Sequence, residues 1–478
     1  MNTIPEMMAN ATIAFSKLPA TISELADMFE SSGFELSLVG GPVRDAFMGI
    51  EPHDFDLTTN AHPGQTEAII KGWADAIWDV GRDFGTIAAR KGDIVVEITT
   101  YRTEQYDPES RKPSVNYGEN LEGDLSRRDF TVNAMAMRLP GYVLVDPFDG
   151  LQDLADGVLK TPVSATQSFE DDPLRIMRAA RFAAQLKVDV SYEVMRAMEE
   201  LAPRLEIVSA ERIRSELERL MITGEPRRGL ELMVYTGVAD YVLPELAALR
   251  ETTDEHGRHK DVYQHTLTVL DQAIDLETDE NGPVPRPDFI LRFAAIMHDV
   301  GKPATRRFEG GGKVCFHHHE IVGAKMTRKR MNALKFDKKT TKAVTGLVAG
   351  HLRFHGYGEQ AWTDSAIRRY VADAGEQLER LHRLTRADCT TRNKRKAQFL
   401  SSAYDDLEDR IKQLKEKEEL DAIRPDLNGN QIMQLLNLGQ SKAVGDAYKY
   451  LLALRMEEGP LGEEEATRRL LEWWKKQA

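Results

Sequence analysis

The sequence predicts an α+β protein, in which an N-terminal head with a mixed or antiparallel sheet precedes an elongated all-α remainder. Short runs of alternating apolar and polar residues, separated by polar turns, dominate residues 33–160 and are typical of strands. From about residue 165 onward the apolar residues recur with the period of a helix. At 478 residues the chain is too long for one hydrophobic core, which favours roughly three or four domains.

The expected strands follow one another between short helical stretches. They are ELSLVGG, HDFDLTT, FGTIAAR, DIVVEITTY and YVLVDPF. The helical remainder is interrupted by polar, Gly- or Pro-bearing segments at 224–226, 277–288 and 424–430, where we expect domain or helix boundaries.

Charge and composition limit the class of protein. The net charge of −14 argues mildly against a nucleic-acid partner, because Lys and Arg contact phosphates. Residues 325–342 nevertheless hold eight basic side chains and one acidic, and residues 379–396 hold seven and two. These segments are candidate backbone-contacting patches, although solvated helix faces explain them equally well from charge alone. No apolar run is long enough to span a membrane and no secretory signal is seen, so we expect a cytoplasmic protein. Two cysteines cannot form a disulfide framework, so we expect both to be free thiols.

Paired carboxylates mark the first candidate site. Asp54 and Asp56 lie two residues apart in a strand-like run, so both side chains point to one face. The same alternation in DIVVEITTY places Glu97 where it can supply a third ligand. Such oxygen donors suit Mg²⁺ in phosphoryl transfer, where the ions activate a 3′-hydroxyl and neutralise the departing pyrophosphate.

A glycine turn precedes this carboxylate pair. The run LVGGPVRD indicates a strand, a turn at Gly40 and Gly41, and a helix opened by Pro42. Backbone amides in this arrangement can bind phosphates, and Arg44 would add a cation. An ordinary strand-to-helix turn is the alternative interpretation.

Taken in order, these motifs resemble the head of class II tRNA nucleotidyltransferases and bacterial poly(A) polymerases. The run RRDFTVNAM at 127–135 resembles a further motif of this family. The resemblance implies that Arg128, Asp129 and Asn133 belong to the nucleotide site and that the head binds Mg²⁺. The run DPFDGLQDL at 146–154 resembles the hinge between head and neck.

Base selection is predicted to lie in EDDPLRIMR. Helical spacing places Asp172, Arg175 and Arg178 along one face, where a carboxylate and guanidinium groups can imitate a Watson–Crick edge for C and A. Spacing alone favours the other interpretation, in which Asp172 is a helix N-cap before Pro173 and the arginines form a solvated stripe. The resemblance to the family's Glu-Asp-x-x-Arg motif favours the template role. The run SAERIRSEL at 209–217 resembles the neck motif that stabilises the template helix.

A second metal constellation is predicted in the helical half. Its candidate ligands, imidazoles and carboxylates at wide helical separations, are His265, His298, Asp299, His319, His351 and Asp388. The series resembles an HD-type phosphohydrolase domain, which implies a divalent metal such as Mg²⁺, Mn²⁺, Ni²⁺ or Fe²⁺ and hydrolysis of a phosphomonoester or a 2′,3′-cyclic phosphate. A degenerate module kept as an RNA-binding body is the alternative.

Three polymerising activities share the head motifs: CCA addition, A-only or C-only addition, and poly(A) synthesis. The run GRDFGTI at 81–87 resembles the Gly-Thr form of CCA-adding enzymes rather than the basic signature of poly(A) polymerases. A long polar loop expected at 101–125 resembles the family's flexible loop linked to the switch from C to A. A non-enzymatic RNA-binding or nucleotide-sensing protein is disfavoured, because the motif residues are intact.

The resemblance thus implies a CCA-adding enzyme of actinobacterial type that acts on the tRNA 3′ end with CTP and ATP. Expected domains are a head at 1–162, a nucleotide-selecting neck at 163–250, an HD domain at 251–400 and a tRNA-binding tail at 401–478. The paired Trp473 and Trp474 are expected to pack rather than to stack on bases. No membrane partner is expected, and protein partners are unknown.

Overall fold

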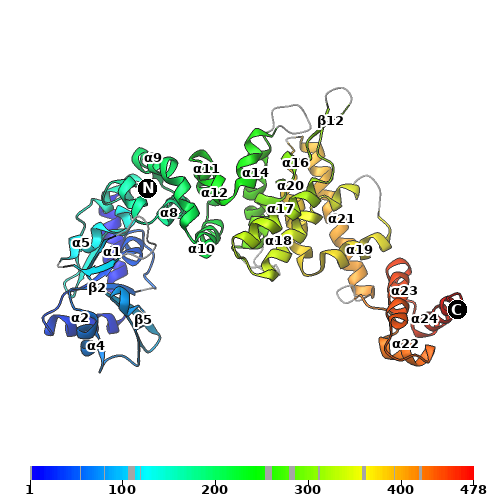
Figure 1. Ribbon diagram of the computed structural model, residues 1–478, viewed down its shortest axis with the longest axis horizontal. Helices are drawn as coiled ribbons and strands as arrows, with labels where there is room; N and C mark the ends of the chain where they lie inside the picture. The colour runs from blue at the N-terminus through cyan, green and yellow to red at the C-terminus, as the bar shows by residue number, and fades with distance from the viewer. Residues whose placement is uncertain are drawn as a thin grey trace. The chain divides into compact units, whose positions relative to one another are not determined.

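The computed structural model describes residues 3–53, 55–79, 81–105, 114–118, 120–252, 261–278, 286–309, 313–357, 362–391, 393–418 and 423–477. The chain forms two compact units, Met1–Pro244 and Glu245–Ala478. Figure 1 shows that the first unit contains the large sheet and that the second is mainly helical. The predicted α+β class is confirmed.

The first unit is organised around a seven-stranded sheet with the order β3-β4-β5-β2-β1-β8-β9. The pair β2 and β5 is parallel, and the other neighbouring strands are antiparallel, so the sheet is mixed. The strands of this unit are β1 Leu36–Val39, β2 Phe55–Thr59, β3 Ala76–Trp78, β4 Thr86–Lys91, β5 Ile94–Thr100, β6 Arg102–Gln105, β7 Ser114–Tyr117, β8 Ala136–Leu139, β9 Val143–Val145, β10 Val158–Leu159 and β11 Asp189–Val190.

Strand β1 is buried throughout, whereas burial alternates along β5 and the first three residues of β2, which gives this part of the sheet an apolar and a polar side. Leu57 and Ile98 are buried, whereas Asp56 and Glu97 are exposed. Helices α2 and α4 contact the sheet and contribute buried side chains such as Phe29 and Ile70. The predicted carboxylates therefore project from the side of the sheet that faces away from its apolar core.

The helices of the first unit form the head's cover and the neck. They are α1 Ile4–Ser16, α2 Ala20–Ser31, α3 Gly41–Phe47, α4 Pro63–Ile70, α5 Leu121–Ser126, α6 Gly150–Asp156, α7 Ala165–Asp171, α8 Leu174–Leu186, α9 Tyr192–Leu201, α10 Ala210–Met221, α11 Pro226–Tyr235 and α12 Val238–Val242. Serine side chains cap α7, α9 and α10 by accepting from backbone N–H groups. Phe182 of α8 packs edge-on against Phe130, with 5.7 Å between ring centroids, and so joins the neck to the head.

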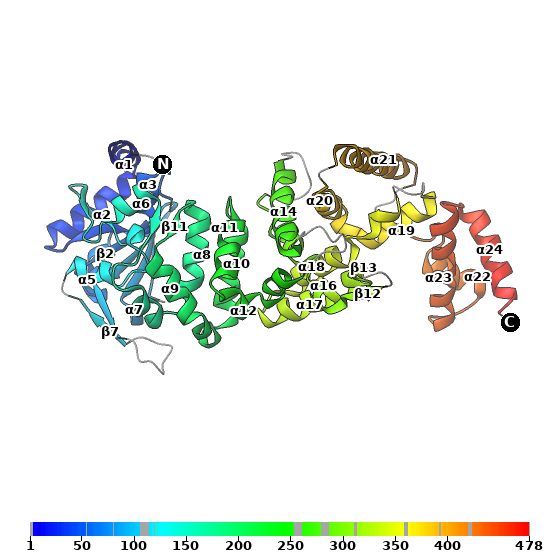
Figure 2. The same cartoon turned by 90° about the horizontal axis from the view of Figure 1, so that it is seen from above.

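The second unit is a helical body followed by a three-helix tail, as Figure 2 shows. Its elements are α14 Val262–Asp275, α15 Phe289–Met297, α16 Lys302–Thr305, β12 Arg307–Glu309, β13 Lys313–Cys315, α17 His319–Ala333, α18 Lys338–Gly350, α19 Asp364–Ala374, α20 Leu378–Asp388, α21 Lys394–Glu418, α22 Gly429–Leu436, α23 Lys442–Glu458 and α24 Glu463–Lys475; α13, Pro244–Ala247, lies at the boundary with the first unit. The tail has its own apolar cluster, against which Trp473 and Trp474 pack. Trp473 also stacks on Tyr450, so the packing prediction is confirmed.

The segment 101–125 differs from the predicted loop. Its described parts form the antiparallel pair β6 and β7 and then helix α5. The sequence pattern hid this hairpin because its strands are short and carry polar side chains. Residues 106–113 and 119 of the predicted loop lie outside the described residues.

Cys315 and Cys389 are both free thiols. Among the described residues, no helix is both long and apolar enough to cross a bilayer.

Candidate active sites

The polar side of the head sheet carries the carboxylate site. Asp56 on β2 and Glu97 on β5 are register partners in parallel strands and are both exposed. Register partners lie roughly 5 Å apart on one face, so the two carboxylates can share one cation. The structure thus brings together two of the three predicted ligands. Asp54 lies outside the described residues.

Arg128 faces these carboxylates from the segment after α5. Its guanidinium lies 3.6 Å from buried Asp124, and its Nε is buried without a hydrogen-bond partner. Burial lowers the pKa of Arg128, although the charges of Asp124 and Asp56 oppose the shift. Gly40 permits this approach, because its φ is +74° and a Cβ there would lie 3.0 Å from Arg128 Nη1. A glycine is therefore required next to this arginine.

A buried network joins the RRDF motif to the neck. Arg178 on α8 donates to Asp129 Oδ2 at 2.7 Å, and Asn133 donates to Asp129 Oδ1 at 3.0 Å. Burial acts to raise the pKa of the Asp129 carboxyl, but the charge of Arg178 and these hydrogen bonds outweigh it and hold that pKa below its ordinary value. Arg44 donates to Asn133 Oδ1 at 2.5 Å, so the glycine-turn helix α3 belongs to the same network.

The predicted template residues occupy different structural positions. Arg175 is buried in α8 and donates to Ser168 Oγ at 2.8 Å and to the Arg127 carbonyl. Asp172 lies in extended backbone between α7 and α8, not within the helix. The expectation that Asp172 shares a helical face with the two arginines was therefore wrong. The residue before a proline disfavours helical backbone, so α7 ends at Asp171 and Asp172 is extended before Pro173.

Asp172 makes two contacts within the neck. Its Oδ1 accepts from the Leu174 backbone N–H at 3.1 Å, as an N-cap does, and its Oδ2 accepts from Arg212 at 2.9 Å. Arg212 is a residue that the prediction did not single out. The signal for it lay in SAERIRSEL, which the sequence interpretation assigned to the neck as a whole.

Glu216 of the same motif is also central to the neck. It is buried and accepts from Arg181 Nε at 2.6 Å, and it lies 3.6 Å from Arg178. Arg181 in turn covers the ring of Phe182 at 4.0 Å. The motif therefore braces α8 through ionic contacts, in agreement with the stabilising role implied by the resemblance.

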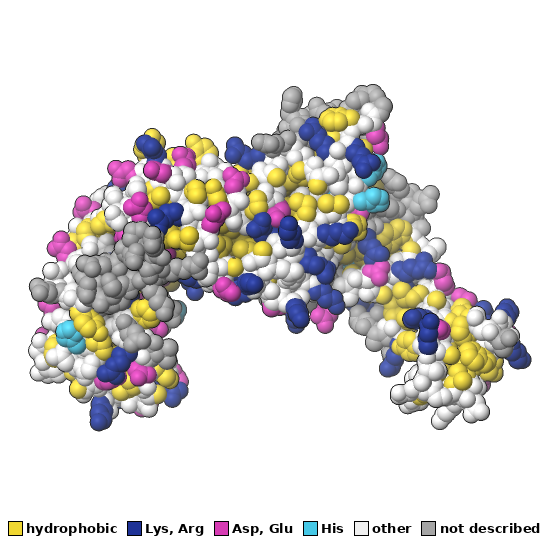
Figure 3. Space-filling model, in the orientation of Figure 1, with side chains coloured by type: hydrophobic (Ala, Val, Ile, Leu, Met, Phe, Trp, Pro, Cys, Tyr) yellow, Lys and Arg dark blue, Asp and Glu magenta, His cyan; other side chains and the backbone are white. Residues whose placement is uncertain are grey.

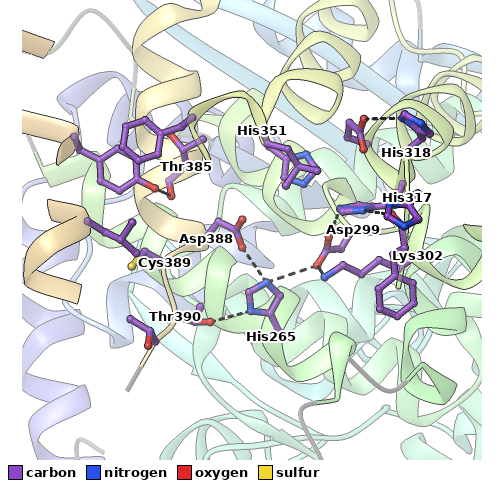
Figure 4. A pocket seen from close by; sticks show the side chains of 18 of the residues that line it. His265, Asp299, Lys302, His317, His318, His351, Thr385, Asp388, Cys389 and Thr390 are labelled. Carbon is purple, nitrogen blue, oxygen red and sulfur yellow. Dashed lines mark hydrogen bonds and ion pairs between the residues drawn. The ribbon is translucent and has the colours of Figure 1, made fainter. Parts of the chain in front are cut away.

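The second unit assembles all six predicted metal ligands in one place. Figure 4 shows four of them, His265, Asp299, His351 and Asp388, around the same pocket. Five helices contribute them: His265 lies in the first turn of α14, His298 and Asp299 follow α15, His319 begins α17, His351 follows α18 and Asp388 ends α20. His265 Nε2 lies 3.0 Å from Asp388, His298 Nε2 lies 3.2 Å from Asp299, and His319 Nε2 lies 3.2 Å from Asp299.

Each imidazole is oriented by a hydrogen bond on its other nitrogen. The Nδ1 atoms of His298, His319 and His351 lie 2.7, 2.9 and 2.7 Å from backbone carbonyls three residues earlier, and His265 Nδ1 lies 3.0 Å from Thr390 Oγ1. Donation to a carbonyl fixes the tautomer and leaves Nε2 free to ligate. Thr390 is a contributor that spacing in the sequence did not reveal.

The chemistry of this donor set fits a divalent metal. The Nε2 atoms of His298, His319 and His351 are buried without a hydrogen-bond partner, which is costly unless a ligand satisfies them. Burial opposes protonation of His298, yet Asp299 and Asp388 raise its pKa to about 10. Burial and the charge of His298 lower the pKa of His351 to about 3. Asp299 Oδ2 also lies 2.8 Å from Lys302 Nζ, so a bound cation would replace the proton of His298 as a partner of the two carboxylates.

Comparisons with known proteins place these sites in a family. Three family models match in order along the chain: the poly A polymerase head domain at 36–160, the probable RNA and SrmB-binding site of polymerase A at 188–249, and the HD domain at 262–393. Fold and sites together define a nucleotidyltransferase with an HD domain.

Individual relatives narrow this class. The A-adding tRNA nucleotidyltransferase of Deinococcus radiodurans is 32% identical over 92% of this chain and 95% of its own. The CCA-adding enzyme of Streptococcus sanguinis is 38% identical over 49% of this chain and 58% of its own. The chain belongs to the tRNA nucleotidyltransferase family.

Solved structures agree in fold. The Bacillus stearothermophilus CCA-adding enzyme in complex with CTP has a TM-score of 0.68 at 21% identity, covering 96% of this chain and 98% of that one. The Thermotoga maritima CCA-adding enzyme complexed with tRNA has a TM-score of 0.61 at 19% identity, covering 97% and 98%. The four domain boundaries and the actinobacterial type stay predictions.

Proposed function

We propose that this chain adds C, C and A to the 3′ end of tRNA from CTP and ATP without a nucleic-acid template. The observation that carries the proposal is the position of Asp56 and Glu97 on the open side of the head sheet, beside Arg128 and the network linking Asp129 to α8. A cytoplasmic location is part of the proposal.

The head residues divide the chemistry between them. Asp54, Asp56 and Glu97 would hold Mg²⁺, which when bound lowers the barrier to attack by a 3′-hydroxyl and stabilises the pyrophosphate that leaves. Arg128 supplies a fixed positive charge next to these carboxylates and would bind the nucleotide. Asp129 is held ionised and immobile by Arg178, so it is prepared to accept from a ribose hydroxyl.

Choice of base is assigned to Asp172 and Arg175. The Asp172 carboxylate can accept from the exocyclic amine of C or A, which G and U do not present at that place. Its ion pair with Arg212 is partly exposed, so it can open at small cost. Arg175 donates hydrogen bonds to Ser168 and to the Arg127 carbonyl. These two bonds fix the direction of the remaining N–H donors of its guanidinium group.

An A-only enzyme is the alternative that one observation favours, because the relative matched over nearly the whole chain is an A-adding enzyme. An addition assay separates these activities. tRNA that lacks its CCA end and tRNA that already ends in CC are each incubated with labelled CTP, labelled ATP or both. Addition of CCA to the first substrate, followed by a stop, supports the proposal. Labelling only of tRNA that already ends in CC would favour the A-only enzyme, and long A tails would favour a poly(A) polymerase.

We also propose that the HD cluster is a metal-dependent phosphohydrolase for a phosphomonoester or a 2′,3′-cyclic phosphate. The supporting observation is the set of buried, unpartnered Nε2 atoms around Asp299. The bound ion, Mg²⁺, Mn²⁺, Ni²⁺ or Fe²⁺, would supply an activated water. In hydrolysis of the cyclic ester the water oxygen bonds to phosphorus, the bond from phosphorus to O2′ breaks, and O2′ takes a proton.

The phosphohydrolase proposal is tested by metal analysis and activity together. The purified protein should contain divalent metal and hydrolyse 2′,3′-cyclic AMP. His298→Ala and Asp299→Ala should lose both properties while tRNA extension continues. Absence of metal in the wild type, or unchanged hydrolysis in both variants, would reject this function and support an RNA-binding body.

A further inference from the structure

The basic segment 379–396 divides into two parts in the structure. Arg380 and Arg386 are paired with acidic side chains of neighbouring elements at 2.7 and 2.8 Å, so they stabilise helix packing. Lys394, Arg395 and Lys396 are exposed in the first turn of α21, and no ion pair to a described residue is found for them. These three residues, here called the α21 cations, have no evident packing role.

Their position is electrostatically unusual. The N-terminus of a helix carries a partial positive charge, so cations there are unfavourable unless an anion lies nearby. Asn393 Oδ1 accepts from the backbone N–H groups of Arg395 and Lys396 at 3.1 and 3.2 Å and caps the helix. The α21 cations together with this helix end form a site that suits a phosphate group.

The same helix lines the HD cavity. Lys396, Leu400 and Tyr404 follow one another at helical spacing along a cavity of about 660 Å³, whose opposite wall carries His319 and His351. The Nε2 atoms of both histidines are buried and unpartnered. One continuous cavity therefore joins the metal ligands to Lys396, the one of the α21 cations that lines it, and Thr390 and Thr391 also line it. Arg395 precedes Lys396 in the same exposed first turn of α21.

An aromatic side chain lies beside this cavity wall. Phe399 is 58% exposed and sits four residues after Arg395, so the two occupy one stripe of α21 next to that of Lys396. Exposed aromatic rings next to cations are used to stack bases of single-stranded nucleic acid. In contrast, the basic surface over α17 and α18, which Figure 3 shows as a gathering of dark blue side chains, lies outside the cavity lining.

We propose that the HD cavity takes the 3′ end of a single-stranded RNA of at least two nucleotides in preference to a free mononucleotide. The terminal phosphate lies at the HD ligands, the preceding phosphodiester is bound by Lys396, Arg395 and the α21 N-terminus, and its base stacks on Phe399. This inference rests on the proposed phosphohydrolase and adds its substrate class.

The test compares two substrates in the full-length protein loaded with Mn²⁺. One is 2′,3′-cyclic AMP and the other is a pentanucleotide ending in a 2′,3′-cyclic phosphate. Arg395→Ala/Lys396→Ala should lower kcat/KM for the pentanucleotide about tenfold and leave the mononucleotide unchanged. The slope of log KM against log salt for the pentanucleotide should fall by roughly 0.7 for each lost phosphate contact. Lys325→Ala/Lys329→Ala, which removes the same charge from exposed positions of α17, is the matched control.

The outcomes separate the two proposals. Equal loss for both substrates, no loss for either, or an equal effect of the control pair would overturn the RNA subsite while hydrolysis itself stands. If wild-type protein hydrolyses neither substrate, the phosphohydrolase fails. The subsite is then judged by anisotropy of a labelled 3′-phosphorylated pentanucleotide, and it is rejected unless Arg395→Ala/Lys396→Ala weakens binding more than the control pair does.

Discussion

At the scale of single residues, Asp129 connects the head to the neck within the proposed nucleotide site. It accepts from Arg178 of the neck and from Asn133 of the head, and its side chain is buried. Removing one partner of such a pair leaves the other charge uncompensated in a partly dry environment. If the proposed nucleotide site is correct, this network couples nucleotide binding to the position of α8.

Asp129→Asn should test this coupling. The substitution keeps the shape and removes the charge that holds Arg178, so we expect kcat/KM for nucleotide addition to fall by about a hundredfold, ~3 kcal/mol. Asp171→Asn is the control. This substitution removes the same charge from a carboxylate that accepts a hydrogen bond from Gln167. Steady-state addition kinetics on tRNA measure both, and similar rates for the two variants would contradict the network.

His382 provides a residue-scale prediction on stability. It is 6% exposed, and burial together with Arg386 and Lys415 lowers its pKa to about 4. Because the unfolded value of 6.5 is higher, the unfolded chain binds more protons between these values. The contribution of neutral His382 to the free energy of unfolding is therefore fully present above about pH 6.5. It falls by at most about 3 kcal/mol as the pH drops towards 4.

His382→Phe removes this titration and can keep the stacking on Tyr370. Melting temperatures of wild type and variant are compared at pH 7.5 and 5.0. We expect the wild type to lose more of its Tm between these pH values. An equal loss in both proteins would show that His382 is not responsible.

At the scale of elements, the HD site depends on a close approach between α16 and α17. A Cβ at Gly301 would lie 2.1 Å from the His319 carbonyl and 2.7 Å from the Gly323 backbone nitrogen. No side chain fits there, because both neighbouring atoms belong to the backbone. The glycine of the HDVGKP run therefore sets the distance between Asp299 and His319.

Gly301→Ala should displace α17 and pull His319 away from Asp299. We expect loss of bound metal and a destabilisation of at least ~2 kcal/mol, as for overpacked interiors. Gly346→Ala is the control, because its Cβ meets no atom within 4 Å and alanine favours the helix. Metal content and thermal melting measure both variants, and retained metal in Gly301→Ala would refute this account of the site.

Elements also show what the sequence could predict. The alternation in HDFDLTT and DIVVEITTY predicted both strands and the shared face of Asp56 and Glu97. A strand with one buried face has apolar residues at every second position, so the sequence itself records this arrangement. The HD ligands were predicted through their residue types. Asp172 was misplaced because local geometry at Pro173 overrides helical spacing, and Arg212 was missed because its partner is 40 residues away. Contacts over such separations follow from packing, which spacing does not encode.

At the scale of the whole molecule, the two proposed phosphate chemistries belong to separate compact units. The carboxylates and helix α8 lie in the unit ending at Pro244, and the HD ligands lie in the other. We therefore expect two thermal transitions. Mn²⁺ at about 100 times its Kd for the HD site should raise the transition of the second unit, by ~2.7 kcal/mol of added stability. Calorimetry of wild type and His298→Ala measures this. The shift should disappear in His298→Ala, and a shift retained in that variant would contradict the prediction.

Selection of C and A by protein side chains can be measured by single-nucleotide incorporation. ATP, CTP, GTP and UTP are supplied one at a time to tRNA ends awaiting C or A, with wild type, Asp172→Ala and Asp56→Asn. We predict that Asp56→Asn loses incorporation of every nucleotide, whereas Asp172→Ala keeps turnover but loses its preference for C and A over U and G. Wild-type selectivity in Asp172→Ala would contradict template-free selection by this residue.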